Sequence, residues 1–303
     1  MRVEVKYRLA FGPGREDLLQ SMKPIKFVSQ RVGQFASFVD EELTRFRFSA
    51  TPEVDGFYVS MFELHFQYSA EEMAKASVFQ ITAQRSFVEL TYDEKTAYDE
   101  SDCCPFDCGY GRFQLGPMVL PQLAKRRFPP FFRHGGGQFL CSHDFAREIL
   151  LRNSTTEYTP VFSSVRSLST FLASGLSASP RSDIEPLRDL PGVVALQLNS
   201  ASTVDLSADT KTGVDPYREG ENPFPCPLGH IFGYRQISPL VVKPLPEPLD
   251  LAFSKQLWGT HSKSSFWPRQ ELLASRSVSE LFLEKKIKYI DVIPVYSEDG
   301  TIL

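Results

Sequence analysis

The chain has 303 residues, of which 42% are hydrophobic and 23% charged, and its net charge is −4. These values are typical of a soluble globular protein long enough for two domains. Without a basic excess to neutralise phosphates, nucleic-acid binding is disfavoured. No apolar run approaches the roughly 20 residues of a membrane span, and the start lacks the apolar segment of a signal peptide. Five cysteines, an odd number, fit a reducing compartment, so we expect a cytoplasmic protein without a membrane partner.

The first 92 residues are expected to form an α/β region of unknown role. Alternating side chains predict strands over 2–9 and 57–68, and Ser69 followed by two glutamates predicts a helix start. A helix is predicted over 34–46 because its apolar residues have helical spacing: Phe35, Phe38, Val39, Leu43 and Phe46. Short strands are expected near 27–29, 79–82 and 87–90.

Two cysteine stretches further along the chain resemble each other. The first is Cys104-Pro-Phe-Asp-Cys108-Gly-Tyr-Gly111-Arg-Phe-Gln114-Leu-Gly-Pro117. The second, 122 positions later, is Cys226-Pro-Leu-Gly-His230-Ile-Phe-Gly233-Tyr-Arg-Gln236-Ile-Ser-Pro239. They align without a gap, and each is followed by an apolar, strand-like run. The glycines fit turns that need an unusual backbone conformation, and the glutamines are expected to bond backbone groups of the turns.

A second block recurs in the same order. Leu140-Cys-Ser142, ending at Thr159-Pro160-Val161, is echoed by Leu273-Ala-Ser275, ending at Ile293-Pro294-Val295. Ser142 and Ser275 are each expected to cap a helix. The sequence therefore predicts an internal duplication: a first knuckle–strand–helix unit over 93–176, a connecting segment over 177–225 and a second unit over 226–303. A helix is expected over 165–176, at the end of the first unit. Within the connection, 193–198 is expected to be a strand and 205–225 a loop.

The fold class expected from these patterns is α+β, with mixed short strands and helices around a zinc-ribbon-like centre. Cys104, Cys108, Cys226 and His230 supply the Cys₃His set of a structural zinc site, two ligands from each turn. Each pair is separated by three residues, whereas the usual knuckle has two, and Cys103 could replace Cys104. The alternative is a degenerate site whose turns are kept for the fold.

Catalytic patterns are weak. Cys141-Ser142-His143-Asp144 combines nucleophile, base and acid, but consecutive residues at a helix start cannot converge on one substrate. His134 beside Gly135 lacks the Gly-x-Ser-x-Gly motif that would make it part of a hydrolase site. No catalytic residue is assigned, and a metal-dependent or cysteine enzyme of unknown reaction remains the alternative to a binding protein.

The chain resembles the double-CXXCG proteins described chiefly from myxobacteria, and related bacterial immunity-like proteins. The resemblance covers roughly 79–161 and 226–297 and rests on Tyr98-Asp-Glu before Cys104, Cys108-Gly109, the Gly-x-x-Gln with its following Pro, and the late helix ending in Pro-Val. It implies zinc binding through Cys104, Cys108 and Cys226; His230 and the longer spacing depart from the family pattern. Some members protect the producing cell against a partner toxin. We therefore expect a non-catalytic binding protein with a protein partner, and the acidic segments Asp93–Asp102 and Asp205–Glu221 are candidate contact surfaces.

Overall fold

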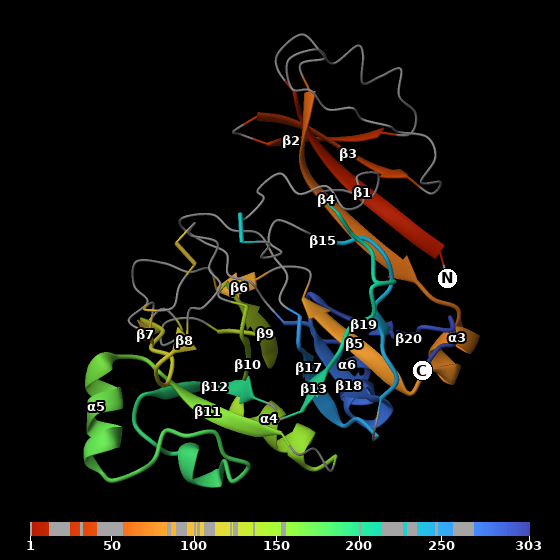
Figure 1. The fold of residues 1–303 in the computed structure, drawn as a ribbon. Coiled ribbons are helices and arrows are strands. Elements are labelled where there is room, and N and C mark those ends of the chain that lie inside the picture. Colours follow the sequence, from red (N-terminus) through yellow and green to blue (C-terminus); the bar gives the residue numbers. More distant parts are fainter. Residues whose placement is uncertain are drawn as a thin grey trace.

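A computed structural model gives the fold of the chain (Figure 1). It describes residues 2–11, 25–30, 33–40, 57–83, 86–88, 96–99, 101, 104–105, 113–121, 123, 127–135, 137–152, 156–199, 202–213, 227–228, 235–245, 248–256 and 270–303. The architecture is α+β, as expected. One four-stranded sheet and two five-stranded sheets account for most of the described strands. No helix in the described ranges has the length and apolar character that crossing a membrane requires.

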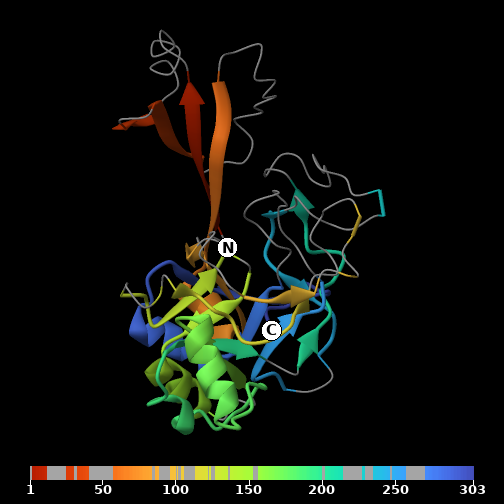
Figure 2. The same cartoon turned by 90° about the vertical axis from the view of Figure 1, so that its left-hand side faces the viewer.

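The N-terminal sheet is antiparallel with strand order β2-β3-β1-β4. Its strands are β1 (Arg2–Phe11), β2 (Ile25–Gln30), β3 (Gly33–Asp40) and β4 (Phe57–Gln67). In both views the sheet extends away from the rest of the molecule (Figures 1 and 2). The helix predicted over 34–46 is wrong for 34–40, because β3 pairs with β1 on one side and β2 on the other. Pairing on both sides satisfies its backbone, whatever the spacing of its apolar residues. Positions 41–46 lie outside the described residues.

The other two sheets have the same strand arrangement. The first has the order β11-β12-β10-β9-β6, from β6 (Ser86–Val88), β9 (Phe131–His134), β10 (Phe139–Cys141), β11 (Glu157–Phe162) and β12 (Val193–Asn199). The second has the order β19-β5-β18-β17-β13, from β5 (Val78–Ala83), β13 (Thr203–Val204), β17 (Leu251–Ser254), β18 (Leu272–Ser275) and β19 (Ile290–Pro294). In each sheet the short outer strand is parallel to its neighbour and the other pairs are antiparallel.

The two sheets also share their register. Gln197 on β12 lies opposite Leu140 and Thr159. The corresponding rung of the second sheet consists of Leu273, Gln80 and Ile293. These are the positions that the sequence alignment of the second block places together.

Each sheet takes one inner strand, the neighbour of its antiparallel edge strand, from the other half of the chain. β5 lies between β18 and β19 in the second sheet, whereas β6, which follows it, lies in the first. Conversely, β12 lies between β10 and β11 in the first sheet, and β13, which follows it, lies in the second. The chain thus crosses between the sheets at two equivalent points. Each of the two five-stranded sheets therefore combines strands from three of the predicted segments: 1–92, 177–225 and one of the two knuckle–strand–helix units.

Four α-helices among the described residues begin where the sequence predicts: α3 (Ala70–Lys75), α4 (His143–Leu150), α5 (Val165–Ala173) and α6 (Arg276–Lys285). The 3₁₀ turn η2 (Glu185–Leu187) was not predicted. The predicted caps are confirmed: Ser69 forms a capping box with Glu72, and the hydroxyls of Ser142 and Ser275 accept the N–H of the residue three positions on. Each cap satisfies a backbone N–H that has no partner within the helix.

Short pairs complete the fold: β7 (Tyr98–Asp99) with β8 (Phe113–Gln114), β14 (Thr212–Gly213) with β15 (Arg235–Gln236), and β16 (Val241–Val242) with β20 (Tyr296–Ser297). The loop expected over 205–225 is confirmed for 205–211, where the structure has turns and one isolated bridge from Leu206 to Val242, and is wrong for 212–213, which form β14. This loop is not free of buried side chains, because Leu206 and Thr210 are buried. The rest of that segment lies outside the described residues.

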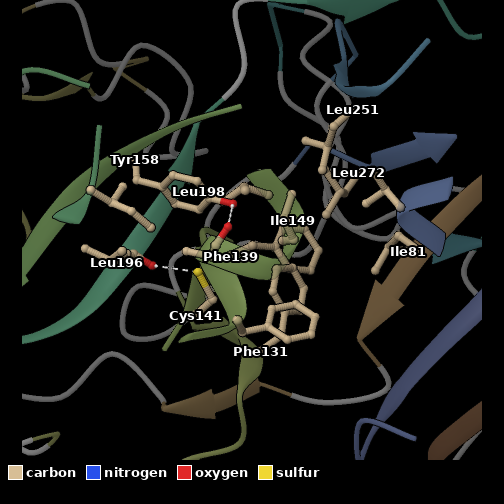
Figure 3. Close-up of a cluster of buried hydrophobic side chains, with 14 of the residues drawn as sticks. Ile81, Phe131, Phe139, Cys141, Ile149, Tyr158, Leu196, Leu198, Leu251 and Leu272 are labelled. Atoms are coloured by element: carbon tan, nitrogen blue, oxygen red, sulfur yellow. Dashed lines mark hydrogen bonds between the residues drawn. The ribbon is translucent and has the colours of Figure 1, made fainter. Parts of the chain in front are cut away.

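One core is shared by the two sheets, with α4 and α6 contributing to it. Phe131 and Phe139 from the first sheet belong to the same cluster as Ile81, Leu251 and Leu272 from the second (Figure 3). Phe282 of α6 packs edge-on against Phe131, with ring centroids 4.8 Å apart, and against Phe145 of α4. The halves therefore bury apolar side chains against each other in this cluster.

Each sheet buries a second cluster on its other face, and the two outer clusters match position by position. The first contains Met118, Leu120, Phe132, Leu140, Val161 and Ala195. The corresponding residues of the second are Leu240, Val242, Ala252, Leu273, Val295 and Val78. Equivalent backbone positions of the two sheets thus carry different apolar side chains in the two outer clusters.

Candidate functional site: the bases of two hairpins

Both cysteine stretches fall between the paired strands of a hairpin. β7 and β8 pair antiparallel with Tyr98 opposite Gln114, and β14 and β15 pair with Thr212 opposite Gln236. Cys104 and Cys108 lie between the first two strands in the chain, and Cys226 and His230 between the second two. The strand pairs therefore form the bases of two equivalent hairpins.

A threonine fixes each base to the strand-like run that follows it. The hydroxyl of Thr96 accepts the N–H of Val119 at 3.1 Å. The hydroxyl of Thr210 accepts the N–H of Val241 at 2.9 Å and donates to the carbonyl of the same residue at 2.8 Å. Val119 and Val241 are equivalent positions of the aligned stretches. The sequence analysis missed both threonines, although each lies two residues before its hairpin strand.

A glutamine joins each base to an inner strand of a sheet. The amide nitrogen of Gln114 donates to the carbonyl of Gly116 and to the side-chain oxygen of Gln197 on β12, at 2.5 and 3.0 Å. Gln236 donates to the carbonyl of Ser238 at 2.8 Å and forms a reciprocal amide pair with Gln80 on β5. The prediction that the two glutamines bond to nearby backbone is confirmed. Their partners on β12 and β5 could not be predicted from the sequence.

The two bases differ in their buried polar groups. Glu271 is 3% exposed, and one of its carboxylate oxygens accepts the amide of Gln80 at 3.0 Å. The same backbone position in the first sheet is held by Gln138, whose side-chain oxygen lies 3.4 Å from Nδ1 of the buried His134. The backbone position is thus equivalent in both halves, but its surroundings differ. The second half has the buried carboxylate of Glu271 there, whereas the first half has Gln138 beside the buried imidazole of His134.

The predicted zinc ligands lie mostly outside the described residues. Cys104 is described and is 7% exposed. Cys103, Cys108, Cys226 and His230 are outside the described ranges, as are Gly111 and Gly233. Within the part of the chain that the structure describes, no three His, Cys, Asp or Glu side chains form a group that could hold a metal ion. The four-ligand site therefore stays a prediction.

The residues with catalytic side chains near α4 have structural roles. Cys141 is fully buried, its thiol lies 3.6 Å from the carbonyl oxygen of Leu196, and burial raises the pKa of the thiol far above its usual value (Figure 3). Ser142 caps α4, and Nε2 of His143 lies 2.7 Å from the carbonyl oxygen of Ile184. A thiol held protonated at neutral pH is not a nucleophile.

The two acidic segments differ in what their described residues do. Asp99 at the end of β7 accepts the backbone N–H of Ser101 at 2.9 Å, and this bond lowers the pKa of its carboxyl. Asp205 is engaged internally: it pairs with Lys255 at 2.8 Å, which lowers the pKa of the aspartate. Asp99 is therefore the better candidate for contact with a partner.

Comparison with models of known protein families, with curated proteins and with solved structures found no match. The two hairpins and the contacts at their bases are therefore the features on which a function can be proposed.

Proposed function

We propose that the chain is a non-catalytic cytoplasmic binding protein whose two hairpins present the cysteine segments to a protein partner. The resemblance to immunity-like proteins favours a toxin as that partner. The proposal includes an internal duplication, because registers, helix caps, hairpin bases and outer clusters recur in the same order.

One observation carries this proposal: the same contacts fix the base of both hairpins. In each, a threonine hydroxyl, a glutamine side chain and a backbone bond join the base to the body of the protein. The backbone bonds are Leu115 N–H to Ala97 O and Ile237 N–H to Lys211 O, both 3.0 Å. Loops anchored at both ends have less conformational freedom to lose when they bind. A fold that repeats this anchoring is suited to presenting two loops.

Zinc is part of the proposal. Three thiolates and one imidazole, from Cys104, Cys108, Cys226 and His230, form a donor set that zinc accepts in closed structural sites. An ion held by all four would link the two hairpin loops, and Cys103 is the alternative to Cys104. A zinc-ribbon-like centre of this kind would have no open position for a substrate.

Charge reversal at the first acidic segment tests the binding function. The partner is captured with tagged full-length protein from the native host at low salt, and its association is then measured by surface plasmon resonance. Asp99→Lys with Glu100→Lys should slow association on the order of threefold to tenfold at low salt and leave the melting temperature unchanged. Salt should reduce the difference because it screens exposed charges.

Asp183→Lys with Asp189→Lys is the matched control, because both aspartates are exposed on the segment between α5 and β12. Equal slowing of association by both double variants would mean that association depends on the net charge of the protein and not on the first acidic segment. Absence of any captured partner, together with turnover of a metabolite by the purified protein, would instead favour the metal-dependent or cysteine enzyme.

A further inference from the structure

β19 is the last strand of the second five-stranded sheet. Among the described residues no strand pairs with its outer edge, which we call the open edge. Val295 donates its N–H to the carbonyl of Val78 at 3.1 Å. Alternation along an antiparallel ladder then turns the N–H and C=O of Val292 away from β5. Pro294, with no N–H to offer, occupies the next outward-facing position, as prolines of edge strands do.

The equivalent edge of the first sheet is occupied. Tyr158 on β11 lies opposite Leu198, as Val292 lies opposite Ile81 on the corresponding rung. Tyr158 donates its N–H to the carbonyl of Arg181 at 2.8 Å and accepts the N–H of Arg181 at 3.0 Å. This position of the repeat therefore accepts an extended backbone running antiparallel to the edge strand.

A pocket of about 340 Å³ lies beside the open edge. Val292 lines it together with Phe282 and Leu283 of α6, Ile287 just after that helix, and Phe66 at the end of β4. Leu283 is a large apolar side chain that is 46% exposed. The pocket thus offers apolar surface next to outward-facing backbone groups.

The mouth of the pocket carries positive charge. Lys286, which ends α6 in a left-handed conformation, is exposed and lines the pocket. Lys288 is exposed nearby, with its ammonium group 5.1 Å from the ring centre of Tyr289. Neither lysine forms an ion pair with a described carboxylate, whereas Lys285 pairs with Glu148. Asp291 is the carboxylate of the lining, and it already has an interaction partner.

We propose that the β19 edge and this pocket form a docking site for an extended, acidic segment of a partner protein. The segment adds antiparallel to β19 at Val292, as Arg181 does to β11, places one apolar side chain in the pocket and sets carboxylates against Lys286 and Lys288. Backbone bonds supply affinity in such strand addition, and the pocket supplies selectivity. The site uses none of the proposed zinc ligands, so it stands or fails independently of them.

The test uses the full chain and two labelled heptapeptides, one alternating valine with glutamate and one alternating valine with lysine. Binding is followed by fluorescence anisotropy. Val292→Pro removes the outward N–H without touching a bond to β5, and Val292→Thr is the matched β-branched control. The acidic peptide should bind the parent and Val292→Thr, and bind Val292→Pro about tenfold or more weakly. Lys286→Glu should reverse the preference between the peptides.

A second measurement does not depend on the proline variant folding. Hydrogen exchange at the Val292 amide should be fast in the free protein and slow with the acidic peptide bound. Protection of that amide in the free monomer would overturn the proposal, since β4 or another part of the chain would then fill the edge. Self-association abolished by Val292→Pro would overturn it in favour of a second copy. Equal binding to a folded Val292→Pro, or no binding of the acidic peptide, would also reject it.

Discussion

At the scale of single residues, equivalent positions of the two halves share their backbone geometry and differ in their side-chain chemistry. Glu271 and Gln138 share a backbone position, since each accepts through its carbonyl a 2.8 Å bond from the last residue of the neighbouring strand. Only Glu271 supplies a buried carboxylate, and it is held by the amide of Gln80. Removing one member of such a buried pair leaves the other without its bond, which costs more than the bond itself is worth. The second hairpin base is therefore the less tolerant of the two to substitution.

Zinc binding gives a prediction at a single cysteine. If the four ligands act together, the purified protein should carry about one zinc per chain, and Cys226→Ala should lose it and melt at a lower temperature. Elemental analysis and thermal unfolding measure the two effects. Cys141→Ala is the control, because that thiol is buried beside Leu196 and belongs to no ligand set. If the parent protein contains no metal and is as stable as Cys226→Ala, the site is degenerate and binds no zinc.

At the scale of elements, the sequence predicts the helix caps but not the pairing of strands over long distances. The caps at Ser69, Ser142 and Ser275 are predicted because a cap needs only a hydroxyl and the next three residues. The helix predicted from residue 34 onward rests on the helical spacing of apolar residues, but 34–40 belong to β3 because pairing with β1 and β2 satisfies the backbone there. The place of β5 depends on residues about 200 positions away, and no local pattern carries that information.

The hairpin bases give a prediction about an element. Thr210→Val removes a hydroxyl that both accepts from and donates to Val241, leaving two backbone groups of that residue without their bonds. The free energy of unfolding should fall by about 1–3 kcal/mol, measured by urea denaturation. Thr210→Ser keeps the hydroxyl and should stay close to the parent. Thr96→Val should cost less, because Thr96 accepts one N–H only. A loss of stability for Thr210→Ser, with Thr210→Val close to the parent, would mean that the methyl group, and not the hydroxyl, stabilises this base.

At the scale of the whole molecule, the exchange of the inner strands β5 and β12 makes the two halves interdependent. A fragment ending after Gly175 contains β6, β9, β10 and β11 but lacks β12, and the remaining fragment lacks β5. Gly175 is exposed, and a Cβ there would meet nothing within 4 Å, so a chain break at this point disturbs no packing.

Fragments 1–175 and 176–303 should therefore form a 1:1 complex when produced together, and neither should unfold cooperatively alone. Size-exclusion chromatography and circular dichroism test this. Full-length protein with a protease site after Gly175 serves as control: once cut, it should still elute as the intact chain. Cooperative unfolding of either fragment by itself would mean that one sheet can be completed without its exchanged strand.

The same exchange determines when the molecule can be completed during its synthesis. β5 leaves the ribosome early, but its two neighbours, β18 and β19, follow roughly 200 residues later. At translation rates of about 5–20 residues per second, that is a delay of about 10–40 s. Throughout it, an apolar strand with two open edges has no native partner, and such strands are prone to pair with other chains. The growing chain therefore depends on keeping β5 soluble until its last residues have been made.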